Sequence, residues 1–230
     1  MPDSLVAAAS APDFWLRARR SLTRRDPVLG AVIRACGPGA LVPRGDPFLT
    51  LARSVVGQQI SVAAAQTIWS RFEAACGRVE PGRVSRMREA TFARCGLSMR
   101  KIEYLRGLAT GFHRGEIDPA RWQTMDDESV IADLTRLRGI GRWTAEMFLI
   151  FNLQRPDVLP LDDIGLLRAV ARHYPPEGTA PGTENPQEPA ARRHRESRAR
   201  VQVLAERWRP WRSVATWYLW RSLDPLPVDY

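Results

Sequence analysis

The stretch LRGIGRWTA at residues 137–145, followed by an apolar segment and the run LPLDD at residues 159–163, decides the fold. Apolar residues at helical spacing lie on both sides of Gly139, Ile140 and Gly141, which predicts two helices joined by a turn. Because glycine has no Cβ, this turn can be tight and another backbone can approach it closely. Free amides of the three turn residues and the positive end of the second helix would then bind a phosphate oxygen. The alternative is a turn that only joins two packed helices.

Asp163 lies 20 positions beyond Trp143, at the start of a further helix. An aspartate at such a position most often serves only as an N-cap, because its carboxylate accepts a hydrogen bond from a free amide of the first turn. A glycine hairpin, an aromatic residue and a carboxylate in this order are a less common combination, which favours a catalytic role for Asp163. Asp162 is expected to brace the loop or to cap the helix, and a register shift of one residue would exchange the two roles.

Length and charge narrow the classes of protein. A chain of 230 residues with 44% hydrophobic residues can form one sizeable core or two small lobes. Its net charge of +9 favours a polyanionic partner such as a nucleic acid. Residues 1–12 lack the basic start of a secretory signal, and no apolar run is long enough to cross a bilayer. A soluble cytoplasmic protein is therefore expected.

The sequence offers few groups for covalent or metal chemistry. Lys101 is the only lysine among 34 basic residues, so an amine nucleophile has almost no candidate. The three cysteines and three histidines are scattered without the spacing of a zinc or iron-sulfur site. We therefore predict no metal and no cofactor, and we expect the cysteines to be buried thiols. The cysteines are Cys36, Cys76 and Cys95.

Helix signals recur along the whole chain and no segment requires a strand, so the predicted fold class is all-α. The pair Asp46-Pro47, for example, combines an N-cap with proline at the first helical position. We expect two helical lobes with a cleft between them. The terminal lobe would comprise residues 12–45 and 164–230, and the middle lobe residues 46–163. Residues 175–190 contain five prolines and almost no apolar residues, which predicts a flexible insertion.

With its glycine hairpin at residues 137–145 and the acidic pair Asp162-Asp163, the sequence resembles the helix-hairpin-helix DNA glycosylase superfamily, most closely the DNA-3-methyladenine glycosylase II branch. The resemblance covers about residues 12–223 apart from the insertion, and it corresponds to a short form without the N-terminal β domain of some members. It implies the helix-hairpin-helix glycosylase fold, with Asp163 as the catalytic carboxylate. It also implies double-stranded DNA containing damaged bases as the partner. We expect a monomer without membrane contact that associates with the nucleoid when it acts. The family's hairpin can hold a monovalent cation through main-chain carbonyls, which is the one ion that the resemblance suggests.

The resemblance assigns further roles to residues of the hairpin and of the turn GQQIS at residues 57–61. The residues that would bind the DNA backbone are Gly139, Ile140, Gly141, Arg142 and Thr144. Gln59, with Gln58 beside it, would enter the duplex and fill the gap left by an extruded base; the alternative is an ordinary loop between helices. The residues assigned to the base pocket are Trp143, Trp220, Met147 and Ile164, and both tryptophans could instead be core residues. Lys101 is expected to be exposed near a phosphate.

The function implied by the resemblance is that of a monofunctional DNA glycosylase of base excision repair, which flips out alkylated bases such as 3-methyladenine, hydrolyses them from DNA and leaves an abasic site. Trp143 occupies the position where strand-cleaving relatives have a Schiff-base lysine, so a lyase step is not expected. The missing cysteine cluster argues against the endonuclease III branch. Two alternatives stay open: a non-catalytic helix-hairpin-helix DNA-binding module in which Asp163 is only a cap, and a glycosylase for oxidised or mismatched bases.

Overall fold

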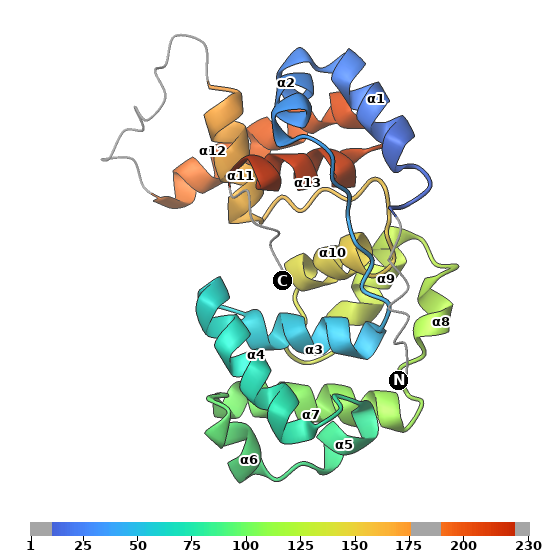
Figure 1. Ribbon diagram of the computed structural model, residues 1–230, viewed down its shortest axis with the longest axis vertical. Helices are drawn as coiled ribbons and strands as arrows, with labels where there is room; N and C mark the ends of the chain where they lie inside the picture. The colour runs from blue at the N-terminus through green and yellow to red at the C-terminus, as the bar shows by residue number, and fades with distance from the viewer. Residues whose placement is uncertain (1–10, 176–189, 224–230) are drawn as a thin grey trace, which may run out of the picture. The chain divides into compact units, whose positions relative to one another are not determined.

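The computed structural model describes residues 11–175 and 190–223, and all regular structure within these ranges is helical (Figure 1). The all-α fold class is therefore confirmed. None of the helices in the described ranges has the length and apolarity needed to cross a membrane. Most of the predicted insertion, residues 176–189, lies outside the described ranges.

The chain divides into two compact units. By residue number, the terminal unit contains 11–43, 154–175 and 190–223, and the middle unit contains 44–153. The sequence placed residues 154–163 in the middle lobe, and this boundary is wrong. The Asp157 carboxylate is hydrogen-bonded to Arg212, and the Val158 amide to Ser213, so this segment is held by the terminal unit. Asp163 therefore belongs to the terminal unit.

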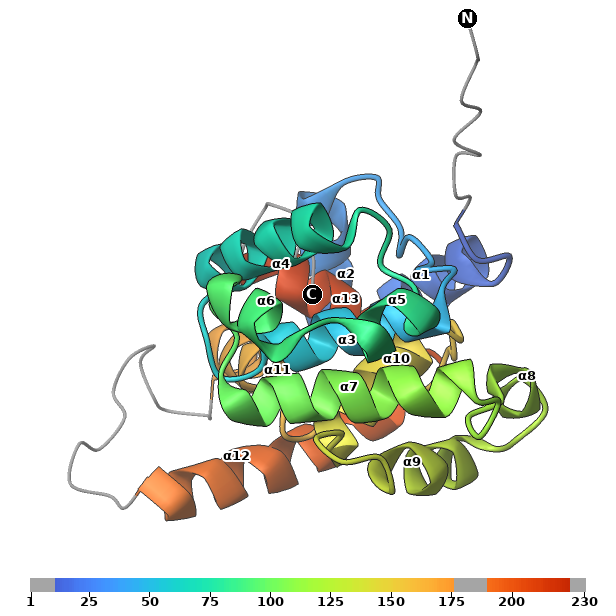
Figure 2. The same cartoon turned by 90° about the horizontal axis from the view of Figure 1, so that it is seen from below.

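The middle unit contains eight helices within the described residues. They are α3 (Pro47–Gly57), α4 (Val62–Cys76), α5 (Pro81–Arg86), α6 (Glu89–Arg94), α7 (Met99–His113), α8 (Pro119–Trp122), α9 (Asp127–Thr135) and α10 (Arg142–Phe151). Helix α7 packs against α3, α5 and α6, and Figure 2 shows it running along the unit. Helix α10 packs against α3 and α9. The rings of Trp122 and Phe148 meet edge to face, with centroids 5.1 Å apart, and fasten α10 to this core.

Local capping explains where several of these helices begin. Asp46 Oδ1 accepts a hydrogen bond of 2.9 Å from the Leu49 amide, and Pro47 occupies the first helical position. Asp126 caps α9 in the same way, through a bond of 2.9 Å from the Ser129 amide. The predicted start of a helix at Asp46-Pro47 is therefore confirmed.

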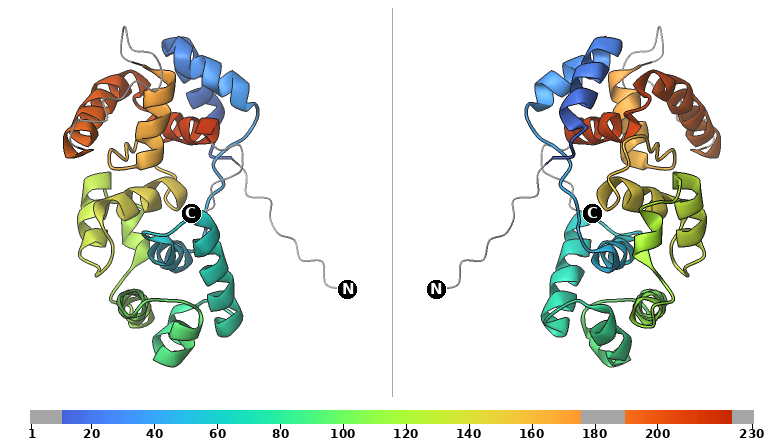
Figure 3. Two further views of the ribbon diagram at one scale, coloured as in Figure 1. Left: turned by 90° about the vertical axis from the view of Figure 1, so that its left-hand side faces the viewer. Right: turned by 90° about the vertical axis from the view of Figure 1, so that its right-hand side faces the viewer.

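The terminal unit is built around α13. Its elements within the described residues are α1 (Trp15–Arg25), α2 (Pro27–Cys36), α11 (Ile164–His173), α12 (Ala190–Ala205), the 3-10 turn η1 (Glu206–Trp208) and α13 (Arg212–Leu223). Helix α13 packs against α2 and α11, and Figure 3 shows α1 and α2 side by side. The buried Asp26 caps α2 and also accepts hydrogen bonds from the Tyr174 hydroxyl at 2.8 Å and from Trp208 Nε1 at 2.9 Å. One carboxylate thus joins α2, the end of α11 and η1.

Candidate functional site

The turn between α9 and α10 has the tight geometry that its glycines predict. Gly139 has φ +88°, and a Cβ at this position would lie 2.2 Å from the ring of Tyr104 in α7, so only glycine fits. Gly141 is exposed, and a Cβ there would meet no atom within 4 Å. Ile140 is buried, and its amide donates a hydrogen bond of 3.0 Å to the Leu137 carbonyl. The expectation that all three turn amides are free is therefore wrong at Ile140.

A groove of about 780 Å³ borders this turn, and its other walls are the first residues of α7 and the turn that follows α3. Gly141 is the N-cap of α10 and supplies no side-chain acceptor to the first helical turn. Arg100 and Arg136 line the groove, and in the part of the chain that the structure describes neither is paired with a carboxylate. A helix N-terminus and two uncompensated positive charges make this groove suitable for an anion such as a phosphate.

Arg142 and Thr144, both assigned to the DNA backbone from the sequence, have other surroundings in the structure. The Arg142 guanidinium is hydrogen-bonded to Glu128 at 2.5 and 3.0 Å and to Glu146 at 3.0 Å. The bond with Glu128 raises the pKa of Arg142 above its ordinary value and lowers the pKa of Glu128. Thr144 is only 3% exposed. Arg142 therefore joins α9 to α10 although its side chain is 51% exposed, and the DNA-backbone contacts of Arg142 and Thr144 stay predictions.

The turn after α3 is tied to the hairpin and to α7. Gln58 is half-buried, and its side-chain amide donates a hydrogen bond of 2.8 Å to the Gly139 carbonyl. Lys101 Nζ donates to the carbonyls of Val56 at 2.7 Å and Gln58 at 2.8 Å, and burial lowers the pKa of Lys101. Lys101 is therefore half-buried and not exposed as expected, and because it lines the groove at the hairpin its proximity to a phosphate stays a prediction. Gln58 holds the turn instead of projecting from it, whereas Gln59 is exposed.

A separate cavity of about 200 Å³ lies within the middle unit. It is bordered by the end of α3, the following turn, one side of α4 and two residues of α10, Trp143 and Met147. Trp143 is half-buried and Met147 is 3% exposed. Arg53 also borders the cavity; its guanidinium lies 5.4 Å from the ring centroid of Trp69 and donates to the Gln66 side chain at 3.1 Å. The structure thus places two of the four predicted pocket residues together in one cavity.

The cavity residues that sequence reasoning missed include Arg53, Gln66 and Trp69. Trp69 follows the helical spacing of the buried Phe72, so periodicity alone assigns it to the core. The signal that could have found them is position, because all three lie on the two helices that the Gln58-Gln59 turn connects. If this turn enters DNA, the sides of α3 and α4 that face each other next to it are candidates for the wall of the base pocket.

Asp163 is the N-cap of α11, and two donors fix its carboxylate. Oδ1 accepts hydrogen bonds from the Leu166 amide at 2.6 Å and from Trp220 Nε1 at 2.7 Å. Asp163 is 4% exposed and Trp220 is 5% exposed. A Cβ at Gly165 would lie 3.0 Å from Oδ1 and 3.1 Å from Trp220 Cδ1, so the glycine gives the indole room to approach. The sequence suggested Trp220 only as a pocket or core residue, and its bond to Asp163 was missed.

The two residues that flank Asp163 are exposed. Asp162 forms an ion pair of 3.1 Å with Arg198 of α12, so it braces the loop and Asp163 alone caps the helix. Ile164 is 61% exposed and, like Trp220, belongs to the terminal unit. The sequence left open which of the two aspartates caps the helix, and in the structure it is Asp163.

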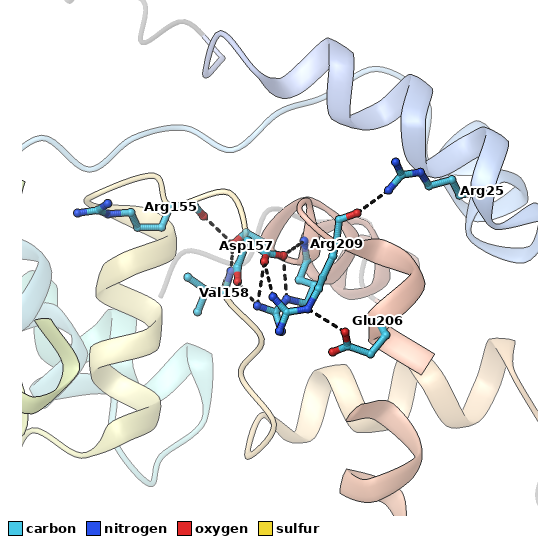
Figure 4. Close-up of polar contacts among 8 residues, drawn as sticks. Arg25, Arg155, Asp157, Val158, Glu206 and Arg209 are labelled. Carbon is cyan, nitrogen blue, oxygen red and sulfur yellow. Dashed lines mark hydrogen bonds and ion pairs between the residues drawn. The ribbon is translucent and has the colours of Figure 1, made fainter. Parts of the chain in front are cut away.

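The loop that leads to Asp163 is anchored by ion pairs to the start of α13 (Figure 4). The Asp157 carboxylate accepts hydrogen bonds from Arg212 at 2.8 and 2.9 Å and from Arg209 at 3.2 Å. The side chain of Arg212 is 15% exposed and that of Asp157 22% exposed, so solvent screens this pair only in part. These contacts explain why the segment belongs to the terminal unit.

Ser213 adds a second anchor to the same loop. Its hydroxyl donates to the Arg155 carbonyl at 2.6 Å and accepts from the Val158 amide at 2.9 Å. Helix α13 therefore holds the loop through Ser213 near its beginning and holds the carboxylate of Asp163 through Trp220 near its end.

The cysteines have no partner for redox or metal chemistry in the described ranges, where no cluster of His, Cys, Asp and Glu could hold a metal ion. Cys76 and Cys95 are buried, as predicted, whereas Cys36 is half-buried. Burial, assisted by the nearby Cys95, raises the pKa of Cys76 to about 11, so this thiol is neutral at physiological pH.

Comparison with known proteins points to one family. The family described as "HhH-GPD superfamily base excision DNA repair protein" matches residues 52–193. DNA-3-methyladenine glycosylase 1 of Schizosaccharomyces pombe is 31% identical over 190 residues, which are 80% of this chain and 76% of that protein. A crystal structure of a DNA-3-methyladenine glycosidase from Bacillus halodurans is similar with a TM-score of 0.73 and 30% identity, over 93% of this chain and 92% of that one. The S. pombe 3-methyladenine DNA glycosylase in complex with abasic DNA is similar with a TM-score of 0.74 and 28% identity, over 93% and 99% of the two chains.

Proposed function

This chain belongs to the HhH-GPD superfamily of base excision DNA repair proteins, and from this premise we propose that it is a monofunctional DNA glycosylase for alkylated bases. It would hydrolyse the bond between deoxyribose and a base such as 3-methyladenine, and leave an abasic site. The observation that carries the proposal is the buried Asp163 carboxylate, held by the Leu166 amide and the Trp220 indole. Relatives named as DNA-3-methyladenine glycosylases support the substrate class.

The chemistry requires a negative charge close to the sugar. As the base departs, positive charge develops on the sugar ring, as in the oxocarbenium-like states of glycoside hydrolysis. An ionised Asp163 about 4 Å from this charge would attract it by about 4 kcal/mol at an effective dielectric constant of 20. An attraction of about 4 kcal/mol corresponds to roughly a thousandfold in rate. Because two N–H donors already fix Oδ1, the carboxylate needs little reorganisation as the charge develops.

The cavity of the middle unit would accept the flipped base. Enzymes that act on an extruded base hold it between aromatic and apolar side chains, and Trp143 and Met147 border this cavity. An alkylated purine in DNA carries a delocalised positive charge, and the electron-rich face of an indole attracts cations. The same positive charge makes the damaged base a better leaving group, so stacking and chemistry would select the same substrates.

The absence of a suitable amine supports hydrolysis without strand cleavage. A lyase step needs a lysine that forms a Schiff base with the sugar. Trp143 stands where the hairpin of strand-cleaving relatives has that lysine, and Lys101, the only lysine of the chain, donates its hydrogen bonds to two backbone carbonyls.

DNA would be held through its backbone by the groove at the hairpin. Gly141 is open to a close approach, and Arg100 and Arg136 supply positive charge. We expect the chain to act on double-stranded DNA as a monomer, since one chain is enough to bind one lesion. A monovalent cation at the hairpin stays a prediction; at Gly139 it would share the carbonyl with the side-chain amide of Gln58.

Identification of the bases that the pure protein releases from methylated, oxidised and mismatched DNA tests the proposal. We expect release of 3-methyladenine from methylated DNA, with abasic sites and intact strands. If bases were released only from oxidised or mismatched DNA, the substrates would be those bases and not alkylated ones. Release of no base from any of the three, with DNA binding retained, would indicate a non-catalytic DNA-binding module instead.

A further inference from the structure

Lys101 lies where the carbonyls at the end of α3 converge. Its ammonium donates hydrogen bonds to the carbonyls of Val56 at 2.7 Å and Gln58 at 2.8 Å, and the side chain is half-buried. A cation at this end of a helix is favoured by the partial negative charge of the last carbonyls. Burial of an ammonium is unfavourable unless its N–H groups are bonded, and burial lowers the pKa of Lys101. The site therefore depends on these two carbonyl contacts.

The contacts of Lys101 form part of a closed ring of interactions. Gln58, whose carbonyl accepts from Lys101, donates its side-chain amide to the Gly139 carbonyl at 2.8 Å. Gly139 in turn lies against the ring of Tyr104, three residues after Lys101 in α7. Helix α7, the turn after α3 and the hairpin are thus fixed to one another by one lysine, one glutamine side chain and one glycine without a Cβ.

Gln59 is the residue whose conformation this ring constrains. It is exposed and has φ +59°, which places a non-glycine residue in the left-handed region. Residues persist in such sparsely populated backbone conformations when the surrounding structure holds them there, and they cluster at functional sites. The carbonyl of the preceding residue, Gln58, is held by Lys101, so the backbone that leads into Gln59 is fixed.

We propose that Lys101 is a positioning residue that holds Gln59 in the conformation that enters the DNA stack. Gln58 connects the same turn to the hairpin, so that the group entering the stack and the groove at the hairpin keep a fixed spacing. The inference rests on the proposed function, because it takes Gln59 as the side chain that fills the gap left by an extruded base. Lys101 itself touches neither the base nor the sugar in this account.

A DNA duplex with a stable abasic analogue and 2-aminopurine as the neighbouring base reports insertion directly, because 2-aminopurine fluorescence rises when the stack is opened. Gln59→Ala and Lys101→Met should each lose most of the fluorescence rise seen with the unaltered protein. Excision of 3-methyladenine by Lys101→Met in a single turnover should slow by about tenfold, the size expected for loss of a charged hydrogen bond. Lys101→Arg, which keeps the charge and N–H donors, should recover part of both signals.

Arg106→Met is the matched control on the same helix. Arg106 also donates a side-chain N–H to a backbone carbonyl, that of Met87 at 3.2 Å, which belongs to neither the turn after α3 nor the hairpin. This variant should keep the fluorescence rise and the excision rate. Equal losses in Arg106→Met and Lys101→Met would overturn the inference, because they would reflect general loosening of α7.

The double variant Lys101→Met with Gln59→Ala separates a positioning role from an independent one. If Lys101 acts through Gln59, the double variant excises no more slowly than the slower single variant. A rate lowered by the product of the two single effects would overturn the inference, as would a full fluorescence rise in Lys101→Met or in Gln59→Ala. Should Lys101→Met fail to fold, Lys101→Gln, which removes the charge but keeps a polar end, takes its place in every arm.

The fluorescence experiment uses abasic DNA without a damaged base, so its result does not depend on whether the protein excises alkylated bases. A protein that releases no alkylated base but shows the Lys101-dependent rise would refute the proposed function and retain the positioning role. Normal excision of 3-methyladenine by the Lys101→Met variant would retain the proposed function and refute the positioning role.

Discussion

The indole N–H of Trp220 donates a hydrogen bond of 2.7 Å to the carboxylate of Asp163, although 57 residues separate them in the chain. Asp163 therefore receives one hydrogen bond from its own helix α11 and one from α13. Helix α13 also anchors the loop before Asp163 through Ser213. The direction of the carboxylate is thus set within the terminal unit, by two helices that pack against each other.

Replacing Trp220 with phenylalanine keeps an aromatic ring and removes the N–H donor together with part of the buried indole. Loss of a hydrogen bond to a charged group corresponds to about 1.5–3 kcal/mol, or roughly 10- to 100-fold in rate if the bond orients the catalytic carboxylate. We expect Trp220→Phe to slow single-turnover excision by this factor while its affinity for DNA changes little. Excision kinetics and a binding titration on the same lesion DNA check both parts.

Trp208→Phe is the control for this variant. It removes an indole hydrogen bond of similar length, 2.9 Å, to the carboxylate of Asp26 in the same unit. Its loss should lower the free energy of unfolding and leave the excision rate unchanged. If both variants slowed excision equally, the effect would be one of stability and not of carboxylate orientation.

Gly165→Ala tests whether space beside Asp163 matters. The new Cβ would lie 3.0 Å from Asp163 Oδ1 and 3.1 Å from Trp220, so one of them must move by a few tenths of an ångström. We expect excision to slow by about tenfold, the lower end of the range for loss of the indole bond. Gly107→Ala in α7, where a Cβ meets nothing within 4 Å, should instead stabilise the fold by about 0.5–1 kcal/mol and keep the rate. Equal excision rates in Gly165→Ala and Gly107→Ala would show that the space between Gly165, Asp163 and Trp220 does not matter for excision.

The two glycines of the hairpin should respond differently to alanine. Gly139→Ala puts a Cβ 2.2 Å from the Tyr104 ring at a φ of +88°, so it should destabilise the middle unit by at least about 1 kcal/mol. Gly141→Ala meets no protein atom, so it should cost only the poorer N-cap preference of alanine and lower the melting temperature less than Gly139→Ala does. Its methyl group would nevertheless stand at the groove, so we expect weaker DNA binding. Thermal melts and binding titrations of both variants decide this; unchanged affinity in Gly141→Ala would contradict a phosphate contact there.

Arg136 and Arg142 should have opposite effects on binding and stability. Arg136 lines the groove without a carboxylate partner in the described ranges, so Arg136→Ala should lower the slope of log affinity against log salt by about 1. Arg142 is bonded to Glu128 and Glu146, so Arg142→Ala should reduce stability and leave the salt slope unchanged. The reverse pattern in salt titrations would support the DNA contact of Arg142 that the sequence predicts.

Local features of the site could be predicted from the sequence because they depend on neighbouring residues. Two glycines around Ile140 specify a tight turn whatever surrounds them, and Asp163 caps the helix that begins at the next residue. The helical periodicity that predicts an all-α chain is local in the same sense.

Contacts between distant segments could not be predicted in this way. Lys101 is charged and lies on a helix with exposed residues, so burial against the carbonyl of Val56, 45 positions earlier, has no local signal. The neutralisation of Arg142 by Glu128, 14 positions away, is likewise invisible to periodicity. The domain boundary was misplaced for the same reason, because Asp157 is held by Arg212.

Asp163→Asn in a single-turnover excision assay tests whether the negative charge of Asp163 drives excision. Asparagine caps a helix about as well as aspartate does, so the fold is kept while the charge is removed. Asp46→Asn makes the same change at the cap of α3 and serves as the control. We predict that Asp163→Asn slows release of 3-methyladenine by about a thousandfold, with DNA affinity and the rate of Asp46→Asn near those of the unaltered protein. Excision by Asp163→Asn at the unaltered rate would contradict the account.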